Sequence, residues 1–329
     1  MIRIENLIKL FGPKKAVDNI SFTVAKGEVL GFLGPNGAGK STTMRMITGF
    51  IPPDSGSIQV GDYNIMTSPI PAKQLLGYLP ENAPLYTDMT VYGFLSFTAE
   101  LRGLRGAARK AAVEKAIDTC FLGQVAHQNV DTLSKGFKHR ACFAQSIIHD
   151  PEYLILDEPT DGLDPNQKHE IRSLIRNMGR SKAIIFSTHI LEEVLEVCTR
   201  ALIIDRGRIV ANGSPSELKA MHPDAGSIIL KVDGVIEAAV KDKLNALNYV
   251  KSFEILKVKE NRVTARVYPK EKGSLFAEQL ANDANQCGWR LEELHTDEGR
   301  LDEVFRQITL PDTVKQDSKK KEPVVTVRI

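Results

Sequence analysis

Apolar and polar positions follow two patterns along the first part of the chain. One pattern is the short apolar run. The run EVLGFL, residues 28–33, leads into a glycine-rich loop and then an apolar helix that we expect to begin near Lys40. Three further runs are rich in Ile and Leu and too short for helices: EYLILD at 152–157, AIIFST at 183–188 and ALIIDRG at 201–207. Runs of this kind fit strands of a parallel sheet that is covered on both faces.

The other pattern is helical. Apolar residues recur at the spacing of one helix face in two stretches: Ile171, Leu174, Ile175 and Met178, then Leu191, Val194, Leu195 and Cys198. Strands that alternate with helices predict a doubly wound α/β core. Residues 88–130 read as helix with no strand between, so we expect a helical insertion that extends to about residue 135.

The pattern changes after residues 221–227, which we expect to link two domains, 1–220 and 228–310. The second domain reads as strand, helix, strand, strand, helix and strand, with a closing helix at 301–309. This βαββαβ order predicts a small ferredoxin-like α+β domain. Residues 311–329 are charged and punctuated by proline, and we expect them to be disordered.

Composition excludes some classes of function. The chain has 43 basic and 41 acidic residues, so it has no global field that would attract nucleic acid or a membrane surface. No run approaches the roughly 18 apolar residues needed to cross a bilayer, and the N-terminus lacks the uninterrupted apolar region of a signal peptide. The four cysteines form no CxxC pair, which argues against a zinc site and a disulfide framework and favours a reducing compartment.

The glycine-rich loop matches the phosphate-binding pattern G-x-x-x-x-G-K-[ST]. Its residues are Gly34, Pro35, Asn36, Gly37, Ala38, Gly39, Lys40, Ser41 and Thr42. The glycines let backbone N–H groups turn toward a phosphate, and the dipole of the following helix adds partial positive charge. We expect Lys40 to reach the outer phosphates and Ser41 to offer its hydroxyl to Mg²⁺.

Two acids and a histidine follow other predicted strands. Asp157 and Glu158 end a buried run, where charges are costly unless they meet a cation or hydrogen-bond donors. With a phosphate loop in the same sheet, Asp157 is expected to hold the Mg²⁺ shell and Glu158 to polarise a water in line with the terminal phosphate. His189 directly follows the run 183–188, and the carboxyl ends of strands converge on the ligand crevice of an open α/β sheet.

In this combination of motifs, residues 1 to about 220 resemble the nucleotide-binding subunit of an ATP-binding cassette (ABC) transporter. The resemblance implies a P-loop NTPase cassette with a mixed sheet core, an antiparallel N-terminal sheet and a helical subdomain. It also implies that Phe11 stacks on adenine, that residues 161–164 form the D-loop with Asp164 among the nucleotide contacts, and that His189 is the switch histidine at the terminal phosphate.

The family's signature loop corresponds to LSKGF, residues 133–137. The resemblance implies that Ser134, Lys135 and Gly136 face a terminal phosphate bound to the other protomer of a dimer. Together with LGYLPENAPLY at 76–86 and the ending LDEVFRQIT at 301–309, this loop looks most like the branch paired with export-type permeases, including the gliding-motility relatives.

Two motifs depart from the family pattern. Glu81 stands where the family has a glutamine that touches Mg²⁺ and relays contact with the permease. A carboxylate is an adequate hard-oxygen ligand for Mg²⁺, but it adds a third negative charge near Asp157 and Glu158. In the signature loop, Lys135 and Phe137 replace a glycine and a glutamine. Lys135 either adds a charge near the transferred phosphate or points into solvent, and the sequence leaves both open.

The resemblance implies an ATPase subunit that binds ATP and Mg²⁺, closes as a dimer and drives a separate integral-membrane permease, an exporter, from the cytoplasmic face of the inner membrane. A homodimer is the simplest arrangement because both halves of a site are intact in one chain, and a heterodimer stays open.

The rival class is a soluble ABC ATPase that acts on nucleic acid or ribosomes. Such proteins resemble tandem cassettes or cassettes split by a long coiled coil, whereas this chain has one phosphate loop and no sustained heptads. The C-terminal domain also lacks the aromatic strand core of an RNA-recognition module. We therefore expect no nucleic-acid partner, and a regulatory or dimer-stabilising C-terminal domain.

Overall fold

The protein is described by a computed structural model that covers residues 1–82, 85–271, 273 and 275–309. Its contacts divide the chain into two units, Met1–Pro215 and a second unit that begins at Ser216, each with its own apolar core. The domain limits expected from the sequence, at 220, 221–227 and 310, remain predictions. The expected disordered tail, 311–329, lies outside the described residues.

The centre of the first unit is a six-stranded mixed sheet. Its order is β10 (Arg208–Gly213), β9 (Arg200–Asp205), β3 (Val29–Leu33), β8 (Ala183–Thr188), β7 (Tyr153–Asp157) and β6 (Leu76–Leu79). Five strands are parallel, and β10 pairs with β9 in the antiparallel sense. Every residue of β3, β7 and β8 is buried, as the continuous apolar runs predict for strands covered on both faces.

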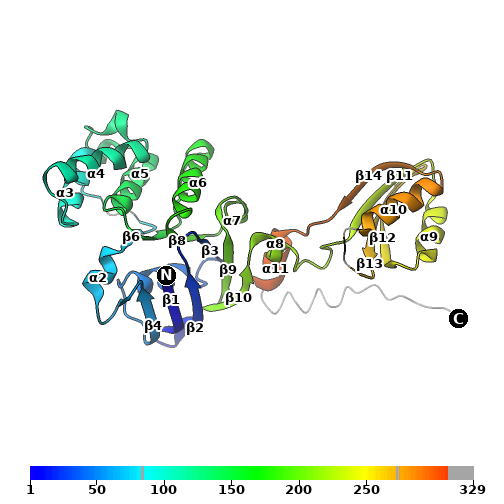
Figure 1. The fold of residues 1–329 in the computed structure, drawn as a ribbon, viewed down its shortest axis with the longest axis horizontal. Coiled ribbons are helices and arrows are strands. Elements are labelled where there is room, and N and C mark those ends of the chain that lie inside the picture. The colour runs from blue at the N-terminus through cyan, green and yellow to red at the C-terminus, as the bar shows by residue number, and fades with distance from the viewer. Residues whose placement is uncertain (83–84, 272, 274, 310–329) are drawn as a thin grey trace. The chain divides into compact units, whose positions relative to one another are not determined.

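Different layers cover the two faces of this sheet (Figure 1). On one face lie α5 (Lys135–Ile147), α6 (Pro165–Gly179) and α7 (Leu191–Val197). On the other face lie α1 (Lys40–Ile47) and an antiparallel sheet of order β2 (Lys14–Val24), β1 (Ile2–Phe11), β4 (Ser55–Val60) and β5 (Tyr63–Asn64). The first unit is therefore an α/β fold with a mixed core sheet and an antiparallel N-terminal sheet, as the resemblance implies.

One residue of the apolar pattern in α7 is not buried. The pattern places Leu195 on the same helix face as Val194, but Leu195 is 42% exposed. The helix has only seven residues and ends at Val197, so Val194 and Val197 supply its buried apolar contacts and Leu195 faces solvent.

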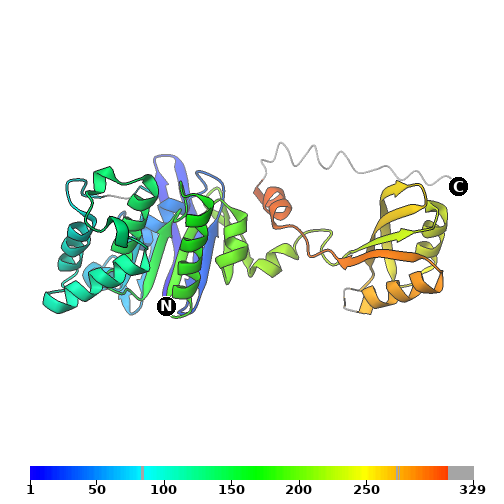
Figure 2. The same ribbon diagram turned by 90° about the horizontal axis from the view of Figure 1, so that it is seen from above.

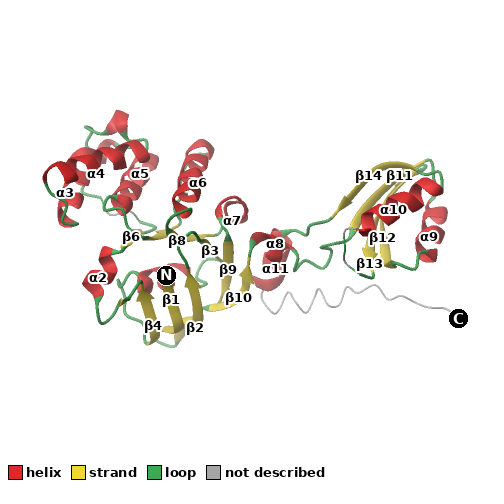
Figure 3. Cartoon of the chain, viewed as in Figure 1, coloured by secondary structure: helices red, strands yellow, loops and turns green. Residues whose placement is uncertain are grey.

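The helical insertion contains α3 (Val91–Leu101), α4 (Gly106–Thr119) and two short 3₁₀ turns, Gly123–Val125 and Val130–Thr132, before the chain enters α5. Residues 88–134 contain no β-strand, as Figure 3 shows by colour. The side chains between these helices join those of α5 and α6 in one apolar cluster. The insertion therefore rests on the same helices that follow the signature loop and the D-loop. A further short helix, α2 (Pro69–Gln74), precedes β6.

The second unit is a ferredoxin-like α+β fold. Its elements are α8 (Pro215–Lys219), which begins on the last residue of the first unit, then β11 (Ile228–Asp233), α9 (Glu237–Ala246), β12 (Val250–Lys259), β13 (Arg262–Pro269), α10 (Leu275–Gln286), β14 (Arg290–Thr296) and α11 (Leu301–Thr309). The sheet order is β12-β13-β11-β14 with every pair antiparallel. Figure 2 shows α10 against one face of this sheet, where apolar side chains form the core.

Nowhere in the described part of the chain is there a helix long and apolar enough to span a bilayer.

Candidate active site

The phosphate-binding loop connects the buried strand β3 to α1. Two of its glycines are required by close backbone packing: a Cβ on Gly34 would lie 2.4 Å from the Ile204 carbonyl oxygen, and one on Gly39 2.4 Å from the Ala16 carbonyl oxygen. Gly39 also has a φ of +111°, a conformation that side chains oppose. Gly39 has no side chain that could cap α1. No side-chain cap therefore covers the N–H groups in the first turn of α1, and a helix terminus of this kind binds phosphate.

The loop opens onto a cavity of about 370 Å³. The cavity brings together residues that are far apart in the sequence: Phe11, Lys14, Ala16, Asn36, Gly37, Gly39, Lys40, Ser41, Thr42, Glu81 and Glu158. The Phe11 ring at its edge is 53% exposed, and the Lys9 ammonium lies 5.7 Å from the centre of that ring. An exposed aromatic face beside a phosphate loop can stack on a nucleotide base.

Lys40 is buried beneath the loop at 6% exposure. Its ammonium donates to the carbonyl oxygens of Gly34 at 2.7 Å and Pro35 at 3.3 Å, and it lies 3.8 Å from a Glu158 carboxylate oxygen. Burial lowers the pKa of Lys40, whereas the charges of Glu158, Asp157 and Glu81 act to raise it. The ammonium is thus held at the point where the loop and the strand-end acids meet.

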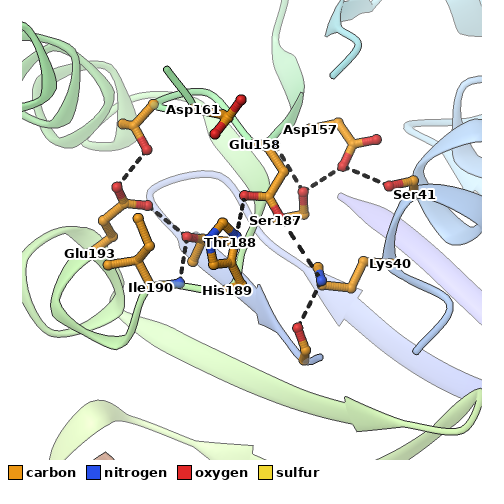
Figure 4. A network of polar contacts seen from close by, with 12 residues as sticks. Lys40, Ser41, Asp157, Glu158, Asp161, Ser187, Thr188, His189, Ile190 and Glu193 are labelled. Carbon is orange, nitrogen blue, oxygen red and sulfur yellow. Dashed lines mark hydrogen bonds and ion pairs between the residues drawn. The ribbon is translucent and has the colours of Figure 1, made fainter. Parts of the chain in front are cut away.

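Asp157 presents one satisfied oxygen and one unsatisfied oxygen. Its Oδ1 accepts hydrogen bonds from the hydroxyls of Ser41 at 3.2 Å and Ser187 at 2.5 Å (Figure 4). Its Oδ2 is buried and has no hydrogen-bond partner among the described residues. A buried carboxylate oxygen without a partner, next to a serine hydroxyl, fits the hard-oxygen ligand set of Mg²⁺. Mg²⁺ sites of this type use one or two carboxylates and complete their shell with phosphate and water.

Glu158 and His189 form a pair at the ends of neighbouring strands. His189 Nδ1 lies 2.9 Å from Glu158 Oε2. Burial raises the pKa of Glu158, and the charges of His189 and Lys40 oppose that rise. The backbone of Glu158 has a φ of +52°, a strained conformation of the kind that clusters at functional sites. Its amide N–H donates to the Ser187 hydroxyl at 3.0 Å, which fixes the strained residue in place.

The signature loop and the D-loop lie side by side at the starts of α5 and α6. Ser134 caps α5 by accepting from the Phe137 N–H at 3.4 Å, and Asp164 caps α6 by accepting from the Gln167 N–H at 2.9 Å. Gly136 is packed so closely that a Cβ there would lie 2.5 Å from the Gln167 side chain. None of the predicted nucleotide contacts on these two loops is among the residues that line the cavity: Ser134, Lys135, Gly136 and Asp164.

Comparison with known proteins agrees with this geometry. The ABC transporter family profile matches residues 17–161. A curated relative, the linearmycin resistance ATP-binding protein LnrL of Bacillus subtilis (strain 168), is 36% identical over 94% of this chain and 98% of its own length. The chain belongs to the ABC transporter family. A second relative, the Nod factor export ATP-binding protein I of Burkholderia lata, is 36% identical over 77% of this ABC chain and 83% of its own length.

Solved structures show the same fold for this ABC cassette. The ATP-binding subunit of an ABC transporter superposes with a TM-score of 0.62 at 27% identity and covers 67% of this chain and 92% of its own. A dimeric ATP-binding cassette in a post-hydrolysis state with ADP and Pi superposes with a TM-score of 0.60, covering 65% and 99%, and at 19% identity it supports the fold alone. This chain is an ATP-binding subunit and an ATP hydrolase of the ABC family.

Sequence reasoning missed four polar residues beside the site of this ABC ATPase: Thr160, Ser187, Thr188 and Glu193. The buried Glu193 carboxylate accepts from the Thr160 hydroxyl at 2.5 Å and from the Thr188 hydroxyl at 2.7 Å. Thr160 precedes the D-loop and Thr188 precedes His189, so one carboxylate joins the two segments (Figure 4). Ser187, which bridges Asp157 and Glu158, was also missed. Its position beside Thr188 at the end of an apolar run was the available signal, whereas Glu193 reads as part of an ordinary acidic helix face.

Proposed function

We propose that this ABC ATPase closes as a dimer on two ATP molecules and powers a separate membrane permease that exports its substrate. The observation that carries the hydrolytic part is the set of contacts between the phosphate loop and the strand-end residues: Glu158 lines the cavity, Ser41 hydrogen-bonds Asp157, and His189 hydrogen-bonds Glu158. The export part is supported by the names of two relatives, a linearmycin resistance protein and a Nod factor export protein. The likeness of the signature loop to the branch that includes the gliding-motility relatives supports the same direction of transport.

Proposed roles follow for the residues that would bind ATP and Mg²⁺ at this cavity. Phe11 stacks on adenine, and the backbone of residues 34–42 with the Lys40 ammonium binds the phosphates. Ser41, Asp157 and Glu81 hold Mg²⁺, which when bound neutralises charge on the phosphates during their transfer. The unpartnered Asp157 oxygen and the place of Glu81 at the cavity support this assignment.

Glu158 is the proposed general base. Its carboxylate polarises a water in line with the terminal phosphate, and burial brings its pKa closer to the working pH. His189 hydrogen-bonds this carboxylate at 2.9 Å, so it orients the base and brings its own imidazole to the terminal phosphate. Ser187 fixes both strand-end acids by bonding to the Glu158 amide and to the Asp157 carboxylate.

The second half of the site is proposed to come from another copy of the chain. Ser134, Gly136 and Asp164 lie outside the cavity of their own chain but sit at the starts of α5 and α6, where helix dipoles favour anions. Because one chain contains both halves, a homodimer would hold two equal sites. The permease would hold this dimer at the cytoplasmic face of the inner membrane, and no nucleic acid takes part.

Reconstitution tests this function. The chain is co-purified with its permease, which is sought in the adjacent reading frame, and Mg²⁺-dependent ATP hydrolysis is measured in proteoliposomes for the wild type and for Glu158→Gln. We expect the permease to raise the rate of the wild type and the substitution to lower kcat by about 10²- to 10⁴-fold, the range that a general base supplies. Absence of hydrolysis in the wild type with its permease, or salt-sensitive RNA binding with no membrane partner, would contradict the proposal.

A further inference from the structure

We propose that Lys135 is a positioning residue, which ties the signature loop to the D-loop of its own chain and makes no contact with a bound phosphate. The inference rests on the proposed dimeric ATPase. The sequence leaves two roles open for this lysine, a charge at the phosphate and a solvated side chain. The structure favours a third role in place of both.

The Lys135 side chain is already engaged within its own chain. Its ammonium lies 3.2 Å from an Asp161 carboxylate oxygen. Its stem lies directly over Gly162, because a Cβ on that glycine would be 2.2 Å from Nζ and 2.4 Å from Cε of the lysine. Because Gly162 has no side chain, the Lys135 side chain can occupy this space. One side chain thus contacts two successive residues of the D-loop.

The position of Lys135 at the start of α5 is also unfavourable for a cation unless an anion lies nearby. It is the first residue of the helix, whose N-terminal turn contains no acidic side chain. A cation in this turn is repelled by the positive end of the helix dipole. Asp161 offsets that repulsion, so the carboxylate of the D-loop lets the signature loop carry a lysine at this point.

The D-loop connects the Lys135–Asp161 contact to the hydrolytic residues. Asp161 directly follows Thr160, which hydrogen-bonds Glu193, and Glu193 in turn accepts from Thr188 next to the switch histidine. The start of the D-loop is therefore held on one side by Lys135 and on the other by Glu193. Releasing Lys135 frees one of these two attachments and leaves the cavity residues in place.

A double-mutant cycle tests the proposal. The steady-state kcat and KM for ATP are measured for the wild type, Lys135→Met, Asp161→Asn and the double variant, with Lys135→Arg as the conservative variant. An exposed ion pair is a weak interaction, so we expect each single neutralisation to lower kcat by about two- to fivefold with KM unchanged. The double variant should be no slower than either single variant, and Lys135→Arg should match the wild type.

Three results would overturn the assignment. An increase in KM for Lys135→Met that Asp161→Asn does not share would make the lysine a phosphate ligand. Losses that multiply in the double variant would show that the two residues act independently. Unchanged kcat in both single variants would make the pair irrelevant to turnover.

Unfolding midpoints within about 2 °C of each other would show that all five proteins are folded. A wild type that neither binds nor hydrolyses ATP would contradict the proposed function itself, before any variant is compared, and this inference with it.

Discussion

Glu158 shows how environment sets the chemistry of a single residue in this cassette. Its carboxylate is partly buried between a lysine and a histidine, and its backbone has a positive φ. Sequence reasoning predicted this acid because it ends an apolar run in a chain that contains a phosphate loop. It did not predict Ser187, whose hydroxyl fixes the acid, because a serine at a strand end is common and carries no charge signal.

The pH dependence of hydrolysis should report the His189–Glu158 contact. Burial raises the pKa of Glu158 and His189 lowers it, so removing the imidazole should raise that pKa further. The base works only when ionised, so the acidic limb of kcat against pH should move to higher pH in His189→Ala. We expect this shift in addition to any overall loss of rate, and kcat measured from acidic to neutral pH would detect it.

His127→Ala is the matched control, because the His127 ring lies in the helical insertion and stacks on Tyr92, whereas His189 contacts Glu158. It should leave the acidic limb where the wild type has it. An acidic limb that stays in place in His189→Ala would mean that the imidazole does not act on the base.

At the scale of single elements, the network around Glu193 joins the end of β8, the start of α7 and the entrance to the D-loop. Its carboxylate is 1% exposed and accepts two hydroxyl hydrogen bonds. Sequence patterns located β8 and α7 but could not reveal this link. The link depends on which side of the seven-residue helix α7 faces the sheet. The sequence pattern does not settle that side, and for the same reason it did not show that Leu195 is exposed.

Glu193→Gln should destabilise the fold. The two carboxylate oxygens of Glu193 each accept one hydroxyl hydrogen bond, whereas the glutamine side chain has one oxygen and would direct its NH₂ group toward the other hydroxyl. Leaving a buried polar group unsatisfied costs about 1–3 kcal/mol. The neighbouring exposed Glu192→Gln is the matched control and should stay within about 0.5 kcal/mol of the wild type. Urea unfolding of the three proteins measures both values. Equal stability of the two variants would show that the network contributes nothing.

Gly39 of the phosphate loop and Gly103 of the helical insertion form a third matched pair. Both have positive φ, but a Cβ on Gly39 would meet the Ala16 carbonyl oxygen at 2.4 Å, whereas one on Gly103 would meet no described residue within 4 Å. Gly103→Ala should cost only about 1–2 kcal/mol of backbone strain and leave ATP binding intact. Gly39→Ala should abolish ATP binding because the loop must move, and titration with a fluorescent ATP analogue measures this. Normal binding by Gly39→Ala would mean that the loop does not need this close approach.

For the molecule as a whole, the sequence predicted an α/β core and the ferredoxin-like unit because strand and helix periodicities alternate clearly in both, whereas the cassette followed from the resemblance of the motifs to the ABC family. The β12-β13-β11-β14 order follows from the predicted βαββαβ sequence of elements. The sequence could not place the signature loop relative to the cavity, because such a placement depends on tertiary packing and on another copy of the chain. Residues 134–136 lie outside the cavity of their own chain, and this is the main structural reason to propose a dimer.

The most direct test of this account is the mass of Glu158→Gln in solution with and without ATP and Mg²⁺. Without its general base the variant should bind ATP and leave it intact, so the closed dimer should persist. Size-exclusion chromatography with light scattering should then give twice the 36.4 kDa of one chain with ATP and the single-chain mass without nucleotide. A variant that binds ATP but keeps the single-chain mass would contradict the proposal that two chains complete each site.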